Sequence, residues 1–201
     1  AIDREAFERG NSVYFSQKVV PMLPERLSND LCSLIPNEDR PALVARLEID
    51  EIGRLVDFQF SEAVIRSKAR LTYNEVQSFY DSGHVGDKRP DDVLENLTNL
   101  RELYKVLRLA RDGRSALDID GLEAIYEFDR GKIKNIVAVK RIDSQRVIEE
   151  CMIIANVAAA KFCNAKPNCI PFRSHPEPDF DKIEKLIWEA KRLGINTSVD
   201  F

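Results

Sequence analysis

Two tyrosines and one glutamate are the side chains whose types and spacing could do chemistry. Tyr14 lies in SVYF and Tyr73 lies in LTYNEV. A tyrosine ring can stack on a nucleic-acid base for about 1–3 kcal/mol per base. Most tyrosines instead pack into a core and keep the hydroxyl in water. Spacing alone therefore favours a core role for both.

Glu149 occurs in SQRVIEECMIIANVAAAKFC, seven residues before Asn156. On a helix these two residues lie on one face, two turns apart. A buried polar group without a partner costs about 1–3 kcal/mol, so both need an explanation. Either Glu149 serves the helix start and Asn156 bonds a neighbouring backbone, or this face lines a ligand channel.

Several common catalytic and metal-binding patterns are missing from the sequence. It has no Gly-x-Ser-x-Gly elbow, no P-loop and no dinucleotide fingerprint. Its four cysteines form no Cys-x-x-Cys pair and only two histidines accompany them, so we expect no zinc site. We expect the cysteines to be inert thiols of a reducing cytoplasm.

Composition bounds the class of protein. The 201 residues are 44% hydrophobic and 32% charged, which is typical of a globular fold. The net charge of −4 argues against a free-standing, charge-driven nucleic-acid binder. No apolar run approaches the roughly 18 residues that span a bilayer. The chain opens AIDREAFERG and its first methionine is Met22, so we expect the natural protein to begin upstream.

Two hairpins are predicted from alternating apolar residues around short turns. ALVARLEID and RLVDFQFSEAVI flank EIG, and AIYEFDRGKIKNIVAVK turns at DRG. In the first strand, alternation places four apolar residues on one side: Leu43, Ala45, Leu47 and Ile49. An irregular segment with several prolines, Val19 to Arg40, precedes this hairpin. We expect it to line a channel wall or to cover a sheet edge.

Four helices are predicted from three-to-four spacing of apolar residues and from end signals. The first lies between Thr72 as cap and Gly83 as stop, and the second runs through VLENLTNLRELYKVLRLARDG. The third covers residues 144–163. The fourth runs from Asp179 to Leu193 and stops at Gly194. The fold class is therefore α+β, a mixed or antiparallel sheet of hairpins packed with several helices.

Several long motifs, in order, carry a family resemblance. They are RGNSVYF, VVPMLPERLSNDLCSLIPNEDR, SEAVIRSKARLTYNEV, LRELYKVLRLAR, SALDI and RVIEECMIIANVAAAKF. Together they resemble the RNB catalytic domain of the ribonuclease R and ribonuclease II family, and their wording is closer to ribonuclease R. The resemblance covers nearly the whole chain and weakens after FRSHPEP. It identifies residues 1–201 as the central part of an incomplete RNB catalytic domain.

The resemblance implies a processive 3′→5′ exoribonuclease that hydrolyses single-stranded RNA to nucleoside 5′-monophosphates with Mg²⁺. The family's metal-binding aspartates lie upstream of the part matching AIDREAFERG, and its catalytic arginine lies downstream. We therefore expect no catalytic or metal-ligating residue in this chain, and no hydrolysis by the chain alone. The expected partner is single-stranded RNA, without a preference for DNA and without a membrane. We expect the parent enzyme to be a cytoplasmic monomer.

The family's RNA contacts match four positions here. Tyr14 matches the tyrosine that stacks near the RNA 3′ end and sets the final product length, and Tyr73 matches a second tyrosine along the RNA path. Glu149 matches a carboxylate that approaches a ribose 2′-hydroxyl, the group that distinguishes RNA from DNA. Ile119 stands where the family often has a phenylalanine that clamps the terminal bases. Isoleucine has no π face, so the resemblance implies a weaker clamp.

A second hypothesis from another class remains open. The chain could belong to a non-catalytic RNA-binding or scaffold protein with a degenerate RNB domain. The flanking sequence discriminates between the two. Clustered aspartates upstream and a serine-proline-isoleucine-arginine motif downstream support the enzyme, and substitutions there support the scaffold.

Overall fold

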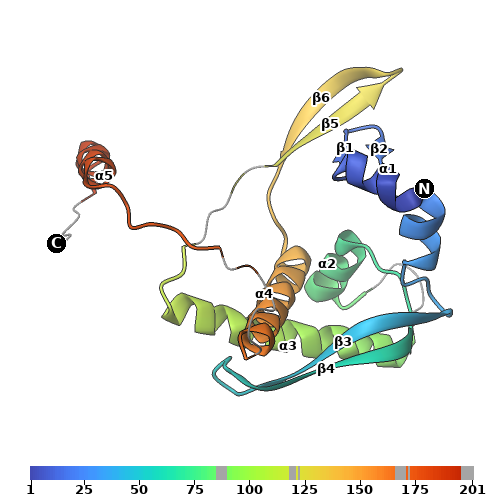
Figure 1. Ribbon diagram of the computed structural model, residues 1–201. Coiled ribbons are helices and arrows are strands. Elements are labelled where there is room, and N and C mark those ends of the chain that lie inside the picture. Colours follow the sequence, from blue (N-terminus) through green and yellow to red (C-terminus); the bar gives the residue numbers. More distant parts are fainter. Residues whose placement is uncertain (85–89, 118–120, 122, 166–170, 172, 196–201) are drawn as a thin grey trace. The chain divides into compact units, whose positions relative to one another are not determined.

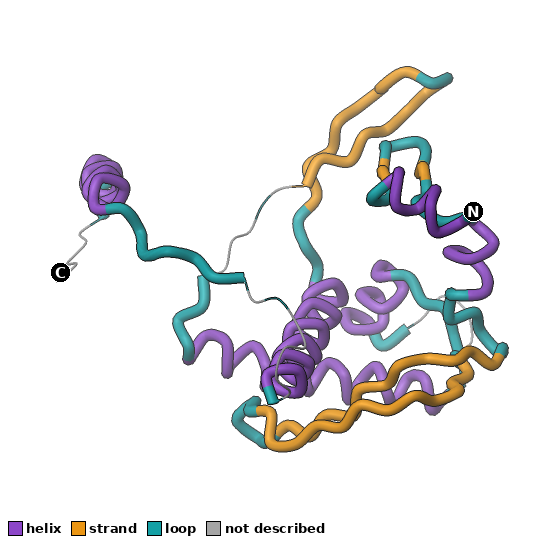
Figure 2. Tube along the Cα trace, in the orientation of Figure 1, coloured by secondary structure: helices purple, strands orange, loops and turns teal. Residues whose placement is uncertain are grey.

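The computed structural model describes residues 1–84, 90–117, 121, 123–165, 171 and 173–195. The chain divides into two compact units, residues 1–161 and 162–201. Figures 1 and 2 show the elements along the chain. The helices are α1 (Ile2–Arg9), the π-type turn η1 (Arg26–Leu31), α2 (Tyr73–Ser82), α3 (Asp91–Gly113), α4 (Asp143–Asn164) and α5 (Phe180–Arg192). The strands are β1 (Val13–Tyr14), β2 (Val19–Val20), β3 (Asp39–Ile49), β4 (Leu55–Arg66), β5 (Glu123–Asp129) and β6 (Lys132–Val139).

All described strands pair as antiparallel hairpins, in three separate two-stranded sheets: β1–β2, β3–β4 and β5–β6. The long hairpin runs in register from Asp39 opposite Arg66 to Ile49 opposite Leu55, with one irregularity at Glu48/Ile49. Both hairpins predicted from the alternating pattern are therefore present. The α+β class is confirmed, and its sheets are antiparallel rather than mixed.

The turn of the β3–β4 hairpin packs against α3. The Asp50 Oδ1 atom accepts hydrogen bonds from the Ile52 N–H at 3.2 Å and the Arg54 N–H at 2.8 Å. These bonds close the turn and lower the pKa of the Asp50 carboxyl. Gly53 has φ +79°, and a Cβ there would lie 2.6 Å from the Ala110 Cβ. Only glycine meets both conditions at this position without strain.

The helix ends follow the predicted signals. The Thr72 hydroxyl accepts from the Glu75 N–H at 3.3 Å, and the Glu75 carboxylate accepts from the Thr72 N–H at 2.7 Å. This reciprocal capping box fixes the start of α2, which ends at Gly83 in the left-handed conformation. In the second unit, the Asp179 side chain caps α5. Gly194, with φ 77°, follows the end of that helix.

A small core joins three helices. Its buried members come from α2, α3 and α4: Tyr80, Leu97 and Val147. Partly buried apolar residues surround them: Leu71, Val76, Phe79, Leu94, Leu100 and Tyr104. Burying each large side chain contributes about 1.5–3 kcal/mol, so this cluster fixes how the three helices meet.

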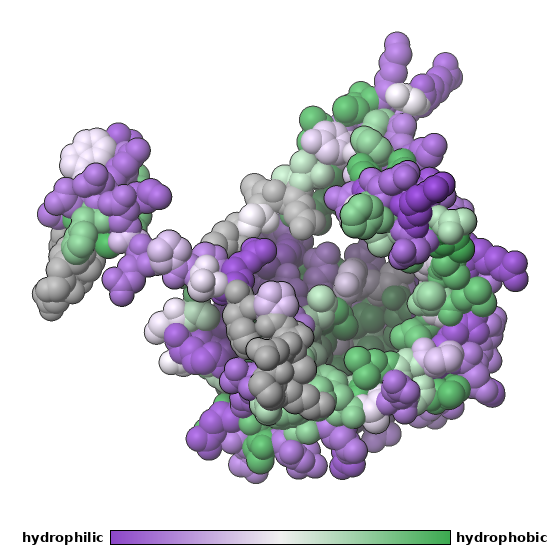
Figure 3. Space-filling model, viewed as in Figure 1, coloured by the Kyte–Doolittle hydropathy of each residue, from purple (hydrophilic) through white to green (hydrophobic). Residues whose placement is uncertain are grey.

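The predicted apolar row on β3 is only half covered. Leu47 and Ile49 are half-buried, whereas Leu43 is 74% exposed and Ala45 is exposed. A two-stranded ribbon twists strongly, so one face cannot stay against the same neighbour over eleven residues. Apolar side chains at other positions of the β3–β4 hairpin also reach the surface. Figure 3 shows apolar residues along the edge where β3 and β4 lie.

The segment predicted to be irregular contains regular structure. Val13 pairs with Val20 and Tyr14 with Val19, η1 follows, and β3 already begins at Asp39. The Arg40 guanidinium, whose side chain is 14% exposed, donates to the Ser33 carbonyl oxygen at 3.1 Å and to Glu38 at 2.6 Å. The Arg40 cation thus organises the end of this segment. The proline and acid content of the segment did not predict these contacts.

A buried ion pair joins α3 to α4. The Arg111 Nη1 atom lies 2.8 Å from the Glu150 Oε1 atom, and the Glu150 side chain is 6% exposed. The neighbouring Cys151 thiol has its pKa raised by burial and by the Glu150 charge, so it stays protonated near neutral pH. This agrees with the expected inert thiol at that position.

We predict that Arg111→Met destabilises the protein by about 3–5 kcal/mol, because it leaves the Glu150 charge buried without its partner. Urea unfolding followed by circular dichroism measures this change. The double variant Arg111→Met/Glu150→Leu should recover most of the loss, since neither charge then remains. Lys105→Met removes an exposed partner of Glu102 and should change stability by less than about 0.5 kcal/mol. An Arg111→Met variant as stable as this control contradicts the role of the pair.

Candidate functional site

Ser144 joins the first turn of α4 to the first turn of α2. Its Oγ donates to the Tyr73 carbonyl oxygen at 2.8 Å, and its N–H donates to the Gln77 Oε1 atom at 3.1 Å. The first N–H groups of a helix lack partners within that helix, so here a side chain of α2 supplies one. Ser144 is only 3% exposed. The backbone of Tyr73 is therefore fixed relative to α4.

Glu149 lies in the second turn of α4 and pairs with Arg141, which precedes the helix. The Arg141 Nη1 atom is 3.0 Å from one carboxylate oxygen of Glu149 and 3.2 Å from the other. The Glu149 side chain is 41% exposed. Its charge is thus neutralised from one side and open to solvent on another. Asn156 is exposed and needs no buried partner.

A cavity of about 440 Å³ opens beside Tyr73. It is lined by Thr72, Tyr73, Asn74, Ile125, Val139, Lys140, Ile142 and Gln145. Tyr73, 48% exposed, offers an aromatic face, and Lys140 offers a positive charge. Gln145 lies four residues before Glu149, on the same helix face and about 6 Å away along the axis. The cavity thus borders the helix that carries Glu149, which is not itself a lining residue.

The other two predicted site residues lie apart from this cavity or outside the description. Tyr14 is 77% exposed on β1 and does not line the cavity. Ile119 lies outside the described residues. Tyr14 and Glu149 are both open to solvent, so neither is sealed in an apolar interior. The structure brings Tyr73 near the helix that carries Glu149, and it leaves Tyr14 as a separate exposed aromatic residue.

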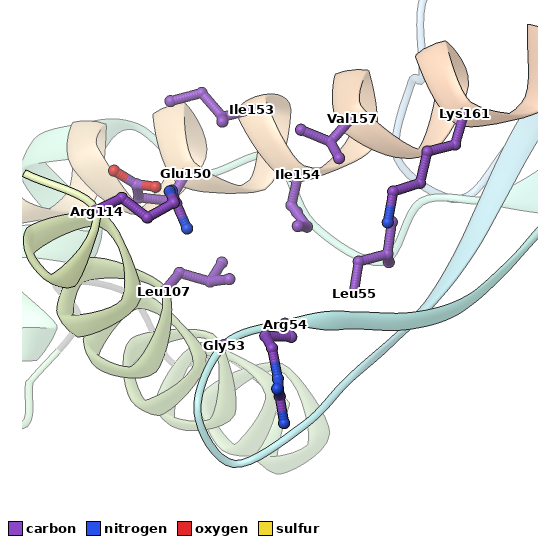
Figure 4. Close-up of a pocket in the computed structure, with 10 residues that line it drawn as sticks. All are labelled: Gly53, Arg54, Leu55, Leu107, Arg114, Glu150, Ile153, Ile154, Val157 and Lys161. Atoms are coloured by element: carbon purple, nitrogen blue, oxygen red, sulfur yellow. The ribbon is translucent and has the colours of Figure 1, made fainter. Parts of the chain in front are cut away.

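A second cavity, of about 450 Å³, lies between α3, α4 and the β3–β4 turn (Figure 4). Leu107, Ile154 and Val157 give it apolar walls, and Arg54, Arg114 and Lys161 bring positive charge to it. Glu150 also lines it, but Arg111 engages that carboxylate. The one carboxylate among the lining residues described is therefore already paired.

The described residues do not fit a magnesium site. Among them, no group of three or more histidines, cysteines, aspartates or glutamates is placed to hold a metal ion. The two adjacent glutamates on α4 are paired with arginines instead: Glu149 with Arg141 and Glu150 with Arg111. Mg²⁺ prefers several open oxygen ligands, which these paired carboxylates do not supply.

Within the described ranges, every helix is too short or too polar to cross a bilayer.

Ser144, Arg141 and Gln77 are functional candidates that the sequence did not single out. Arg141 lies before the helix that carries Glu149, and Gln77 and Ser144 are 67 residues apart, so neither contact follows from the periodicity of one predicted element. The one available signal was the serine at the start of a predicted helix, a position that favours capping. Its partner on another helix could not be inferred from that.

The RNB domain family matches residues 1–200 of this chain. Ribonuclease R of Vibrio cholerae serotype O1 is 40% identical over 199 residues, which cover 98% of this chain. The apo form of Mycoplasma genitalium RNase R superimposes with a TM-score of 0.92 at 29% identity, covering 100% of this chain and 31% of that one. The same protein in complex with ribose methylated single-stranded RNA also gives 0.92 and 29%. The chain spans about a quarter of the V. cholerae protein, 24% of its length.

We predict that Ser144→Ala destabilises the protein by about 1–3 kcal/mol, because the Tyr73 carbonyl loses its hydrogen bond from the buried Ser144 hydroxyl and the two helix starts separate. Thermal unfolding measures the loss. Ser82→Ala is the matched control, since the Ser82 hydroxyl donates to the Ser78 carbonyl at 2.7 Å on an exposed helix face. Equal effects of the two substitutions would count against a special role for Ser144.

Proposed function

The chain belongs to the RNB domain family, and we propose that it forms the central part of the catalytic domain of a processive 3′→5′ exoribonuclease. The substrate is single-stranded RNA and the products are nucleoside 5′-monophosphates. The observation that carries the proposal is the joined start of α2 and α4, which holds Tyr73 beside the helix that carries Glu149. The similarity to an RNase R solved with single-stranded RNA supports the same assignment.

The proposed reaction adds water across the P–O3′ bond before the last nucleotide. The hydroxyl remains on the phosphorus of the released 5′-monophosphate, and the proton goes to the 3′ oxygen of the shortened RNA. We place the Mg²⁺ ligands and the catalytic arginine in polypeptide outside these 201 residues. The role of this chain is to hold the RNA, and we expect it not to hydrolyse RNA alone.

Three side chains divide the proposed RNA contacts. Tyr14 stacks near the 3′ end of the RNA, and its 77% exposure leaves the ring free to do so. Tyr73 lines the RNA path next to the cavity that also contains Lys140. Glu149 accepts a hydrogen bond from a ribose 2′-hydroxyl, through the open side of its carboxylate. Ile119 contributes the weaker side of the clamp.

We further propose that the enzyme is a cytoplasmic monomer that prefers RNA to DNA. Cys32, Cys151 and Cys163 are free thiols, which suits a reducing compartment. The alternative, a scaffold with a degenerate RNB domain, keeps RNA binding but lacks turnover. Adding Mg²⁺ to the protein as its gene encodes it, with a labelled single-stranded RNA, separates the two.

We predict that Tyr14→Ala lengthens or shortens the last resistant product while RNA hydrolysis continues, since a stacked base is worth about 1–3 kcal/mol. Denaturing gel electrophoresis of end-labelled RNA resolves the product ladder. Phe15→Ala, which removes the exposed aromatic residue next along the chain, is the control and should leave the ladder unchanged. A Tyr14→Ala ladder identical to the wild type refutes the assignment.

We predict that Glu149→Gln lowers the preference for RNA over DNA by about tenfold, because it removes one charge-assisted hydrogen bond to the 2′-hydroxyl. The affinities of matched RNA and DNA oligonucleotides, measured in EDTA to prevent hydrolysis, give this ratio. Glu102→Gln, on the exposed face of α3, is the control for loss of a negative charge. Unchanged discrimination in Glu149→Gln rules out the ribose contact.

A further inference from the structure

We propose that Arg141 is a positioning residue for RNA selectivity. It holds the Glu149 carboxylate in the orientation that accepts a hydrogen bond from a ribose 2′-hydroxyl. This inference rests on the proposed function of Glu149. It adds Arg141 as the residue that connects this carboxylate to the fold. The carboxylate alone does not explain the selectivity for RNA over DNA, because a long side chain that moves freely does not stay in hydrogen-bonding position for a 2′-hydroxyl.

The contact between the two side chains restricts the carboxylate. A single guanidinium nitrogen, Arg141 Nη1, lies within 3.2 Å of both oxygens of Glu149. Contact with both oxygens turns the open end of the carboxylate toward the guanidinium and restricts where the group can lie. Ordering a glutamate side chain costs conformational entropy. When Arg141 has already ordered it, RNA binding need not do so.

Arg141 is itself attached to a well-fixed piece of backbone. It precedes α4, where the Ile142 N–H donates to the Gln145 Oε1 atom at 3.0 Å. Ser144 then ties the same turn to α2 through the Tyr73 carbonyl. The Arg141 side chain is only 23% exposed. The junction of α2 and α4 therefore positions the guanidinium, and the guanidinium positions the Glu149 carboxylate.

Glu149 keeps room for a ligand while Arg141 holds it. A carboxylate offers about four lone-pair sites, and one nitrogen cannot occupy them all. The side chain remains 41% exposed, so a donor can approach from solvent. A carboxylate only accepts hydrogen bonds, and the ribose 2′-hydroxyl can donate one, whereas deoxyribose has no such group. The pair is thus built to recognise a sugar hydroxyl.

A different role for Arg141 gives a different result. If the guanidinium bound a phosphate directly, it would contribute to RNA and DNA alike, because phosphate contacts carry no information on the sugar. A positioning residue acts only through Glu149 and therefore changes the RNA-to-DNA ratio. The ratio of affinities, rather than affinity alone, separates the two roles.

The test measures the affinities of matched RNA and DNA oligonucleotides for the protein as its gene encodes it, in EDTA. The variants are Arg141→Gln, Glu149→Gln, the double variant and Arg141→Lys. We expect Arg141→Gln to lower the RNA-to-DNA ratio about tenfold, and the double variant to lower it no further, since the two residues act as one unit. Arg141→Lys keeps a charge and should recover part of the ratio.

Lys105→Gln is the matched control, because it removes one positive charge from the exposed face of α3. It should leave the ratio unchanged.

Equal losses of RNA and DNA affinity in Arg141→Gln overturn the inference and indicate a phosphate contact. A lowered ratio in Glu149→Gln with an unchanged ratio in Arg141→Gln overturns the inference about Arg141 but not the proposed ribose contact of Glu149. An unchanged ratio in Glu149→Gln overturns the ribose contact itself, and the inference with it. Should Arg141→Gln fail to fold, the ratio in Arg141→Lys decides: a ratio between those of the wild type and Glu149→Gln supports the inference, and a wild-type ratio contradicts it.

Discussion

The attachment of α4 to its two neighbours is the constraint on which the rest of the first unit depends. Ser144 ties the start of the helix to α2, and one turn and a half later Glu150 ties it to α3 through Arg111. Val147, 2% exposed, packs between these two polar contacts. The apolar cluster fixes how the three helices meet, and hydrogen bonds of fixed geometry at two levels add a directional constraint on α4. The register of α4 is therefore set by apolar packing and polar contacts together.

Two adjacent glutamates on this helix then serve opposite purposes. Consecutive residues of an α-helix point about 100° apart, so Glu150 faces α3 while Glu149 faces outward. The inner carboxylate is buried and must keep its arginine, because an uncompensated charge there is costly. The outer carboxylate is partly exposed, where an ion pair contributes little to stability. Stability therefore depends little on the outer pair, which suits the recognition role proposed for Glu149, and the inner pair maintains the position of α4.

Local signals predicted much of the fold, and they failed where distant residues meet. The Thr72 cap, the Gly83 stop and both hairpins depend on neighbours within a few residues, and all are present. The exposure of Leu43 was missed because strand twist is a property of the paired ribbon. The Ser144 contacts were missed because their partners lie 67 and 71 residues away. The roles of Tyr14, Tyr73 and Glu149 came from the family motifs, and they remain predictions.

An acidic chain can still contribute to RNA recognition, because affinity and selectivity have different physical origins. Affinity for nucleic acid comes mainly from cations that neutralise phosphates, and a net charge of −4 supplies no surplus of these. Selectivity for RNA comes from a few groups that read the 2′-hydroxyl, and one well-held carboxylate suffices for one such contact. Placing a glutamate near phosphates is unfavourable unless a cation balances it, and Arg141 provides that balance at 3.0 Å. Under the proposed function the chain is therefore suited to distinguish the sugar, whereas its net charge supplies no surplus of cations for the phosphates.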